Sequence, residues 1–124
     1  MTISRGDAYY AQIEKGIGSE QDGDRIVIII QNDIGNKYSP TIIGSFATSS
    51  ITKASLPTHV KLSKDNLDFE SDLRKSKFKN SIVLLEQVRT LDKLRLGTKV
   101  GRIHTDKMHE LDRALAISVG LFII

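Results

Sequence analysis

The segment that most constrains the fold is RIVIIIQ, from Arg25 to Gln31. Residues 26–30 within it are an unbroken run of β-branched side chains, which favour extended backbone and leave no polar face along the strand. A run of this kind is typical of a strand covered on both faces, whereas a half-exposed strand alternates apolar and polar residues. It is also far too short to span a bilayer. We therefore predict a strand buried on both faces.

Four further strands and one helix follow from the pattern of apolar and turn-forming residues. Asn32 to Pro40 collects residues that stabilise turns and is expected to be a loop. Thr105 is expected to cap a helix whose apolar residues recur at roughly helical spacing. Residues 64–80 fit either a short helix or a long loop, and both remain open. The other expected strands are Ala8–Ile13, Thr41–Thr48, His59–Leu62 and Ile82–Leu91, and the apolar helix residues are Met108, Leu111, Leu115 and Phe122.

A chain of 124 residues is long enough to bury one core and too short for two ordinary domains. Several short strands and one terminal helix predict a mainly β fold with a C-terminal α-helix. In this fold a small, strongly bent and largely antiparallel sheet closes or nearly closes into a barrel. We expect residues 1–124 to form a single domain. Such barrels host many activities, so function has to be argued from the site.

The formal net charge of +3 hides an uneven distribution along the chain. Residues 53–102 hold twelve of the 18 Lys and Arg and six of the 15 Asp and Glu, so this segment is +6 and the remainder is −3. A basic region in a small domain indicates a polyanionic partner, because neutralising phosphates releases counterions. A solvated surface is the alternative, and charge alone does not decide between the two.

The sequence contains no cysteine, and its first ten residues are not expected to act as a signal peptide. Without cysteine, disulfides and thiolate zinc sites are excluded and a reducing compartment is the natural expectation. Residues 1–10 carry Arg5 and Asp7 and lack the apolar run of a signal peptide. We therefore expect a cytoplasmic protein that does not contact the membrane.

The sequence offers no recognisable metal-binding or phosphate-loop motif. His59, His104 and His109 have neither HExxH spacing nor a cluster of carboxylates around them. The glycine-rich segment GIGSEQDGD, residues 16–24, lacks a following Lys-Ser/Thr pair and is expected to be a polar loop between two strands. We expect neither a metal nor another cofactor.

Six local blocks, taken in order, resemble the MazF/PemK toxins of bacterial type II toxin–antitoxin pairs. They cover nearly the whole chain: RGDAYYAQI, GSEQ, RIVIIIQNDIGNKYSPT, LPTHV, LLEQVRTLDKLRL and ALAISVGL. The resemblance implies an SH3-like barrel of the CcdB/PemK/MazF type that assembles as a homodimer. It also implies a sequence-specific, metal-independent endoribonuclease, or mRNA interferase. Such an enzyme cleaves single-stranded RNA through the ribose 2′-hydroxyl and leaves a 2′,3′-cyclic phosphate and a 5′-hydroxyl.

The resemblance also implies a protein partner. This partner is a small acidic antitoxin, similar to MazE, whose disordered segment folds over the RNA groove and competes by charge and shape. DNA is expected to be contacted only indirectly, through the complex with the antitoxin.

The positions that match the family's catalytic pair are Arg25 and Thr48, at strand ends that are expected to be neighbours across the barrel mouth. A guanidinium is a poor base near neutrality, so we expect Arg25 to stabilise charge on the phosphate oxygens. Thr48 is expected to orient the phosphate or donate one hydrogen bond, although local sequence does not distinguish it from Thr41, Ser45, Ser49 and Ser50.

Two further groups of residues are expected to contact RNA. Ser19, Glu20 and Gln21 match the family's loop near the cleavage site and can read unstacked bases, with Glu20 a candidate acceptor for the 2′-hydroxyl proton. Strand alternation sends Gln87 and Arg89 to one face and Glu86 to the other. We therefore expect Gln87 and Arg89 to contact RNA, and Glu86 to lie on a charged exterior.

The chain departs from the family pattern in two places. Family members usually have proline directly after the arginine, whereas this chain has Ile26, which restores a backbone donor and frees φ. Residues 71–80, SDLRKSKFKN, resemble an insertion between blocks that normally lie closer together. The insertion either extends a phosphate-binding surface or forms a solvated loop, and we favour the loop. Its basic residues are Arg74, Lys75, Lys77 and Lys79.

Two other functions remain open at this point. A toxin of similar fold, like CcdB, poisons DNA gyrase through a protein interface, although the GSEQ and QNDIGN blocks are not expected there. The other alternative, suggested by Ile26, is a catalytically degenerate member that only binds RNA or its antitoxin.

Overall fold

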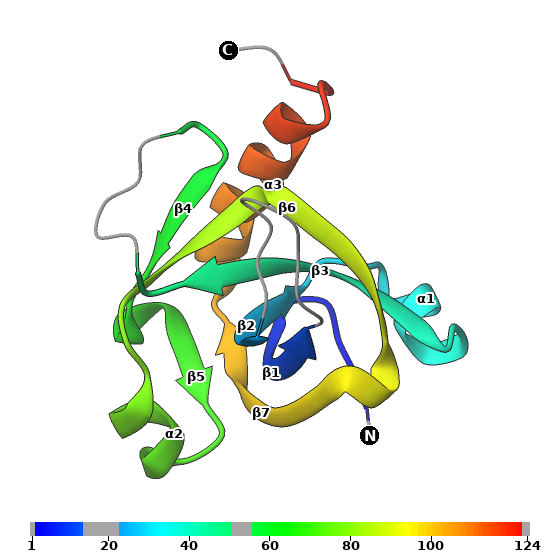
Figure 1. Cartoon of the computed structure of the whole chain (residues 1–124). Helices are drawn as coiled ribbons and strands as arrows, with labels where there is room; N and C mark the ends of the chain where they lie inside the picture. The colour runs from blue at the N-terminus through cyan, green and yellow to red at the C-terminus, as the bar shows by residue number, and fades with distance from the viewer. Residues whose placement is uncertain (1, 14–22, 51–55, 123–124) are drawn as a thin grey trace.

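The computed structural model describes residues 2–13, 23–50 and 56–122. Within these ranges seven strands form one antiparallel sheet in the order β4-β6-β3-β2-β1-β7-β5. Figure 1 shows the sheet curled into a partly closed barrel, with the helix α3 (Thr105–Ser118) packed against it and with α1 (Asp33–Tyr38) and α2 (Asp72–Lys77) on opposite sides. The predicted mainly β fold is confirmed. The strands are β1 (Asp7–Ile13), β2 (Gly23–Ile29), β3 (Thr41–Thr48), β4 (His59–Leu62), β5 (Leu67–Phe69), β6 (Ser81–Asp92) and β7 (Leu96–Ile103).

β2 is covered on both faces, as its sequence predicts. Val27, Ile28 and Ile29 are each 0% exposed. Ile28 belongs to an apolar cluster that includes residues of α3 (Thr105–Ser118), whereas Val27 and Ile29 belong to a second cluster. β2 also pairs with β1 on one side and with β3 on the other. The run is therefore enclosed by two strands and two apolar clusters.

A bulge lets β6 bend around the barrel. Ser45 of β3 pairs with Val88, but the next residue, Phe46, pairs with Leu84, so residues 85–87 are inserted into the ladder. An insertion of this kind bends a strand and increases its twist. The first residues of β6 pair with β4 as well as with β3. One bent strand therefore connects the barrel wall to the edge strand.

The sequence pattern did not predict β5 or β7. β7 contains Gly97 and Gly101 among charged residues, and glycine weakens the signal for a strand. Gly101 is needed where β5 passes, because a Cβ there would lie 2.3 Å from the backbone oxygen of Asp68. The segment left open, residues 64–80, consists of the 3₁₀ turn η1 (Lys64–Asn66), β5 and the short helix α2 (Asp72–Lys77).

The predicted loop over residues 32–40 is wrong, because Asp33–Tyr38 forms the helix α1. The Asn32 side-chain oxygen accepts the Gly35 N–H at 2.8 Å, and the Ser39 N–H donates to the Gly35 carbonyl at 2.8 Å. Asn and Ser stabilise turns because their side chains bond to nearby backbone, and the same property caps helices. The turn-forming residues here enclose one helical segment instead of a loop.

The predicted C-terminal helix is confirmed, with a correction at each end. His104 is the N-cap and makes no side-chain capping bond, so Thr105 is the first helical residue and not the cap. Phe122 lies beyond the helix, where the Arg113 guanidinium lies 4.3 Å from the centre of its ring. No helix in the described ranges is long and apolar enough to cross a membrane. The helix packs on the core through Met108, Leu111 and Leu115.

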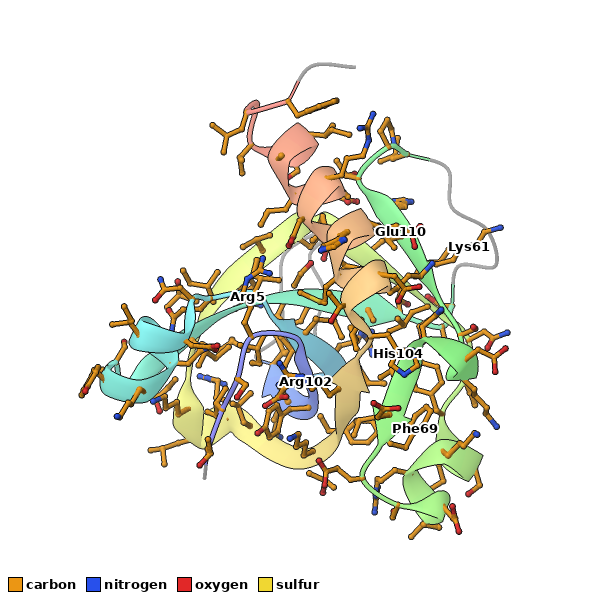
Figure 2. All side chains as sticks on the ribbon, turned by 180° about the vertical axis from the view of Figure 1, so that it is seen from behind. Arg5, Lys61, Phe69, Arg102, His104 and Glu110 are labelled. Carbon is orange, nitrogen blue, oxygen red and sulfur yellow. The ribbon has the colours of Figure 1, made fainter. Side chains whose placement is uncertain are left out.

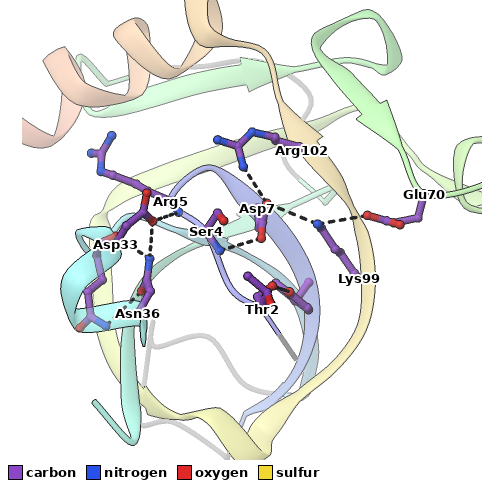
Figure 3. A network of polar contacts seen from close by, with 11 residues as sticks. Thr2, Ser4, Arg5, Asp7, Asp33, Asn36, Glu70, Lys99 and Arg102 are labelled. Atoms are coloured by element: carbon purple, nitrogen blue, oxygen red, sulfur yellow. Dashed lines mark hydrogen bonds and ion pairs between the residues drawn. The ribbon is translucent and has the colours of Figure 1, made fainter. Parts of the chain in front are cut away.

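A buried carboxylate at the start of β1 forms ion pairs with the neighbouring strand β7 (Figure 3). Asp7 is 1% exposed, and its Oδ2 accepts the Ser4 N–H at 2.8 Å. Its Oδ1 lies 3.6 Å from the Lys99 Nζ and 3.4 Å from an Arg102 guanidinium nitrogen, both on β7. A buried charge is tolerated only when it is paired in this way. The RGD block therefore has a structural role.

We predict that Asp7→Asn destabilises the protein by about 2 kcal/mol, because Asn leaves the two cations and the Ser4 N–H with a weaker acceptor. Urea unfolding measures this change. Asp65→Asn, a change in charge on the exposed η1 turn, is the control and is expected within about 0.5 kcal/mol of wild type. Equal stabilities for the two variants would contradict the role assigned to Asp7.

Candidate active site

The pairing register of β2 and β3 brings Arg25 and Thr48 together. Ile26 pairs with Ala47 and Val27 with Phe46, so the next step of the same ladder places Arg25 opposite Thr48. Directly opposed residues point to the same face, with Cβ atoms about 5 Å apart. Arg25 is half-buried and Thr48 is 5% exposed. The two strand ends are neighbours, as expected.

Arg25 and Thr48 line an open pocket of about 290 Å³. The end of β3, the start of β6 and α2 lie on one side of the molecule, where this pocket is found (Figure 1). None of its described lining residues is acidic, and the lining carries three cationic side chains and four hydroxyls besides the Tyr10 phenol. The cations are Arg25, Lys77 and Lys79, and the hydroxyls are those of Thr48, Ser49, Ser50 and Ser81.

Hydrogen bonding separates Thr48 from two of the hydroxyls that the sequence could not distinguish from it. Ser45 is 0% exposed and donates to the Leu84 carbonyl at 2.7 Å, while Thr41 bonds to Ser39 at the far end of β3. The Thr48 Oγ1 accepts the Ser50 N–H at 3.2 Å and lies 2.8 Å from the Ser50 Oγ. The backbone N–H occupies one acceptor position of Thr48, which orients the hydroxyl at the pocket wall.

Ile26 stands where the family usually has proline, and it is an ordinary member of β2. It pairs with Tyr10 of β1 and with Ala47 of β3, and its partly buried side chain packs against the core. Proline restricts φ through its ring, whereas here strand pairing on both sides holds the backbone. The position of Arg25 is therefore set by the sheet.

The other predicted site residues fall into two groups. Ser19, Glu20 and Gln21 lie outside the described residues. Arg89 lies over the Phe46 ring at 5.8 Å, on the face of β3 that also carries Thr48, but it does not line the pocket. Gln87 is half-buried within the bulge of β6, so the ladder does not fix its face as strand alternation predicted.

Glu86 makes hydrogen bonds that join the LPTHV block to β6. Its Oε1 accepts the Thr58 hydroxyl at 2.9 Å, and its Oε2 lies 2.9 Å from the His59 Nε2. Burial alone would raise the pKa of Glu86, but hydrogen bonds from His59, its own backbone N–H and Thr58 hold it below the usual 4.5. The carboxylate therefore stabilises the folded state.

We predict that this contribution is present above about pH 4.5 and is lost as pH falls through the lowered pKa of Glu86, because the unfolded chain then binds the proton first. The side chain is 36% exposed, so solvent screening limits the effect to less than about 1 kcal/mol. At pH 6 we expect Glu86→Gln to melt about 2–3 °C below wild type.

The difference between Glu86→Gln and wild type is expected to vanish near pH 3. Melting curves recorded from pH 3 to pH 6 test this, with Glu110→Gln on the exposed face of α3 as the matched control. A difference between Glu86→Gln and wild type that does not change with pH would contradict the assignment.

Two lysines of the insertion line the site, although the sequence analysis did not assign them to it. We favoured a solvated loop, and Lys77 and Lys79 are indeed exposed. However, they line the same pocket as Arg25. Their signal in the sequence was the buried Phe78 between them, which fixes the segment to the core. Within the described ranges, no group of three or more His, Asp or Glu side chains could hold a metal ion.

Comparison with known proteins identifies close relatives of this chain. The family described as PemK-like, MazF-like toxin of type II toxin–antitoxin system matches residues 4–119. Endoribonuclease EndoA of Bacillus subtilis (strain 168) is 46% identical over 121 residues, covering 98% of this chain and 97% of that protein.

Solved structures with the same fold are more distant in sequence. MazF from Deinococcus radiodurans superposes with a TM-score of 0.73 at 18% identity, covering 97% of this chain and 98% of that one. An endoribonuclease in complex with its cognate antitoxin, from Mycobacterial species, superposes with a TM-score of 0.72 at 20% identity, covering 98% and 99%. These structures support the barrel fold.

Proposed function

Because this chain belongs to the PemK-like, MazF-like toxin family of type II toxin–antitoxin systems, we propose that it is a sequence-specific endoribonuclease that cuts single-stranded RNA without a metal. The observation that carries the proposal is the pocket at the strand ends. It combines Arg25 and Thr48 with two further cations and has no acidic side chain among its described lining residues. A polyanion fits such a pocket better than a neutral or cationic substrate. We place the activity in the cytoplasm.

The proposed reaction is a transesterification within the RNA chain. The 2′-oxygen bonds to the adjacent phosphorus while the bond to the 5′-oxygen breaks, which leaves a 2′,3′-cyclic phosphate and a 5′-hydroxyl. Glu20 takes the 2′-hydroxyl proton, and the leaving oxygen takes a proton from solvent. Arg25 stabilises the negative charge that grows on the phosphate oxygens, and Thr48 donates one hydrogen bond to them. Ser19, Gln21, Gln87 and Arg89 contact the bases and backbone of the substrate.

We predict that Arg25→Ala lowers kcat about 10²–10³-fold, because it removes a preorganised cation from the developing charge. Arg25→Lys is expected to recover part of this loss, and Thr48→Val to cost roughly tenfold through one lost hydrogen bond. The measurement is cleavage of defined RNAs in EDTA with sequencing of the new ends. Lys37→Ala, on the exposed surface of α1 across the molecule from the pocket, is the control.

A wild-type protein that yields no site-specific 5′-hydroxyl end across diverse RNAs would overturn the proposed activity. Gyrase-dependent DNA breakage in its place would favour a function like that of CcdB. RNA binding without cleavage would indicate a degenerate member. Full activity in Arg25→Ala would remove Arg25 from the mechanism.

An acidic antitoxin similar to MazE is the protein partner we propose. Structures of relatives are described as an endoribonuclease with its cognate antitoxin and as MazE-MazF complexes. The pocket suits an acidic segment for the same reason that it suits RNA, so the antitoxin competes with the substrate. Contact with DNA is then made only through the antitoxin.

We also propose that two copies of this chain pair through the apolar face between α3 and the middle of β3, which fits the homodimer implied by the family resemblance. Ile43, Val119 and Leu121 are 37%, 59% and 83% exposed and line one groove of about 540 Å³. A patch of this kind is a recognised mark of a protein interface, and a two-fold axis pairs the same face with itself.

We predict that Ile43→Asp shifts the protein from dimer to monomer, because a charge at this position stays unpaired and desolvated in the interface. Light scattering coupled to size exclusion measures the mass. Leu94→Asp, at a side chain that is 94% exposed on the 3₁₀ turn η2 (Lys93–Arg95), is the matched control and is expected to remain dimeric. A monomeric wild type would overturn the proposal.

A further inference from the structure

From the pocket and the helix beside it, we propose that Lys77 and Lys79 form a phosphate-binding subsite that holds the RNA backbone next to the scissile position. This inference rests on the proposed function and assigns substrate contact to a segment, residues 71–80, that resembles an insertion relative to the family. Both lysines line the pocket that contains Arg25 and Thr48.

The fold fixes where these two lysines emerge. Phe78, between them, is 3% exposed and packs edge to face on Phe69, with ring centroids 5.4 Å apart and planes at 64°. Figure 2 shows Phe69 on β5, beside α2. Lys77 is the last residue of α2 and Phe78 is its C-cap, with extended backbone (φ −69, ψ 133), while the lysines on both sides of Phe78 are exposed. Lys77 and Lys79 are therefore presented outward together.

Hydrogen bonds at both ends hold the segment in this position. The Ser71 hydroxyl accepts the Arg74 N–H at 3.2 Å at the start of α2. The Phe78 N–H donates to the Arg74 carbonyl at 3.1 Å at its end, and the Ser81 hydroxyl donates to the Lys79 carbonyl at 2.7 Å. Less backbone entropy is then lost when a ligand binds here than in a free loop.

The lysines on the two sides of α2 differ in the charged side chains that surround them. Lys77 and Lys79 have no ion pair among the described residues, and no acidic side chain lines the described part of their pocket. Lys75, on the same helix, instead lines a hollow together with Asp68, Glu70 and Asp72. Toward the pocket, the positive charge of these two lysines thus has no ion pair among the described residues, while the positive charge of Lys75 is offset by carboxylates.

The pocket continues into a second hollow, which extends the path for a strand of RNA. Ser49 and Ser81 line both spaces, and the second one, of about 390 Å³, reaches Lys61 on β4 and again has no acidic lining among the described residues. Cations thus line a continuous path from Arg25 past Lys77 and Lys79 toward Lys61, which fits an extended polyanion. A basic groove that follows the backbone is typical of single-stranded RNA binding, so we take RNA as the ligand of the two lysines.

The test measures binding and cleavage separately. Binding uses a random 20-nucleotide single-stranded RNA with 2′-O-methyl groups, which blocks the proposed nucleophile, followed by fluorescence anisotropy from 50 to 300 mM salt. For single strands, log K falls as log salt rises, and each lost phosphate contact makes this slope shallower by about 0.7. We expect the slope of the double variant Lys77→Gln/Lys79→Gln to be shallower by about 1.4, and its affinity at 100 mM salt to be roughly tenfold weaker.

Two controls separate a phosphate contact from a structural effect. Lys75→Gln makes the same change of charge on the acidic side of α2 and is expected to keep the wild-type slope. The double variant Lys77→Arg/Lys79→Arg keeps the charge and is expected to keep the slope too. Thermal melting of each variant checks that the fold is retained. In cleavage assays the Gln double variant is expected to raise KM with kcat within about twofold, because uniform binding is removed.

An unchanged salt slope in the folded Gln double variant would overturn the subsite, whether or not the wild type cleaves RNA. If the antitoxin alone loses affinity for this variant, the lysines serve the protein partner and the inference is wrong. A reduced slope without any cleavage by the wild type would support the subsite and overturn the proposed activity. The two proposals can therefore fail independently.

Discussion

The pairing of β2 with β3 is the constraint on which the rest of this structure depends. Val27, Ile28 and Ile29 are fully buried, with their side chains divided between two apolar clusters. A slip of one residue would exchange the two faces and would carry polar Arg25 or Gln31 into a position that an isoleucine now fills, which disfavours another register. The same register sets Arg25 opposite Thr48. Core packing therefore positions the candidate catalytic pair, and Ile26 is accommodated without the proline that the family resemblance leads one to expect.

Many residues that carry the family resemblance maintain this scaffold and lie outside the pocket. Asp7 of the RGD block pairs with two cations of β7, and Glu86 joins Thr58 and the first residue of β4 to β6. In the QNDIGN block the Gln31 amide donates to the Asn36 side chain at 3.1 Å, and the Asn36 amide donates to the Gln31 carbonyl at 2.9 Å. Buried polar groups need partners of this kind, which leaves few residues that can replace them. Resemblance of these blocks is thus evidence first for the fold.

The effect of each charged side chain on the site depends on where the fold places it. The sum of +6 over residues 53–102 includes Lys99, which pairs with Asp7 and Glu70, and Lys75, which lies among carboxylates. Lys77 and Lys79 belong to the same basic segment yet face a pocket without described acids. Because the field of a site depends on distance and on which charges neutralise each other, a charge count along the chain cannot separate these cases.

The sequence alone determined the strands β1, β2, β3, β4 and β6, the C-terminal helix and the family. These depend on runs and periods that a single segment carries within itself. Only the tertiary structure decided that Asp33–Tyr38 is helical, that glycine-containing β7 is a strand, that Thr48 and not Ser45 faces the pocket, and that Lys77 joins Arg25. The last three outcomes depend on contacts between residues far apart in the chain, whereas the helix depends on capping residues that suit a turn as well as a helix end. Local propensity does not encode which partner a backbone or a side chain will meet.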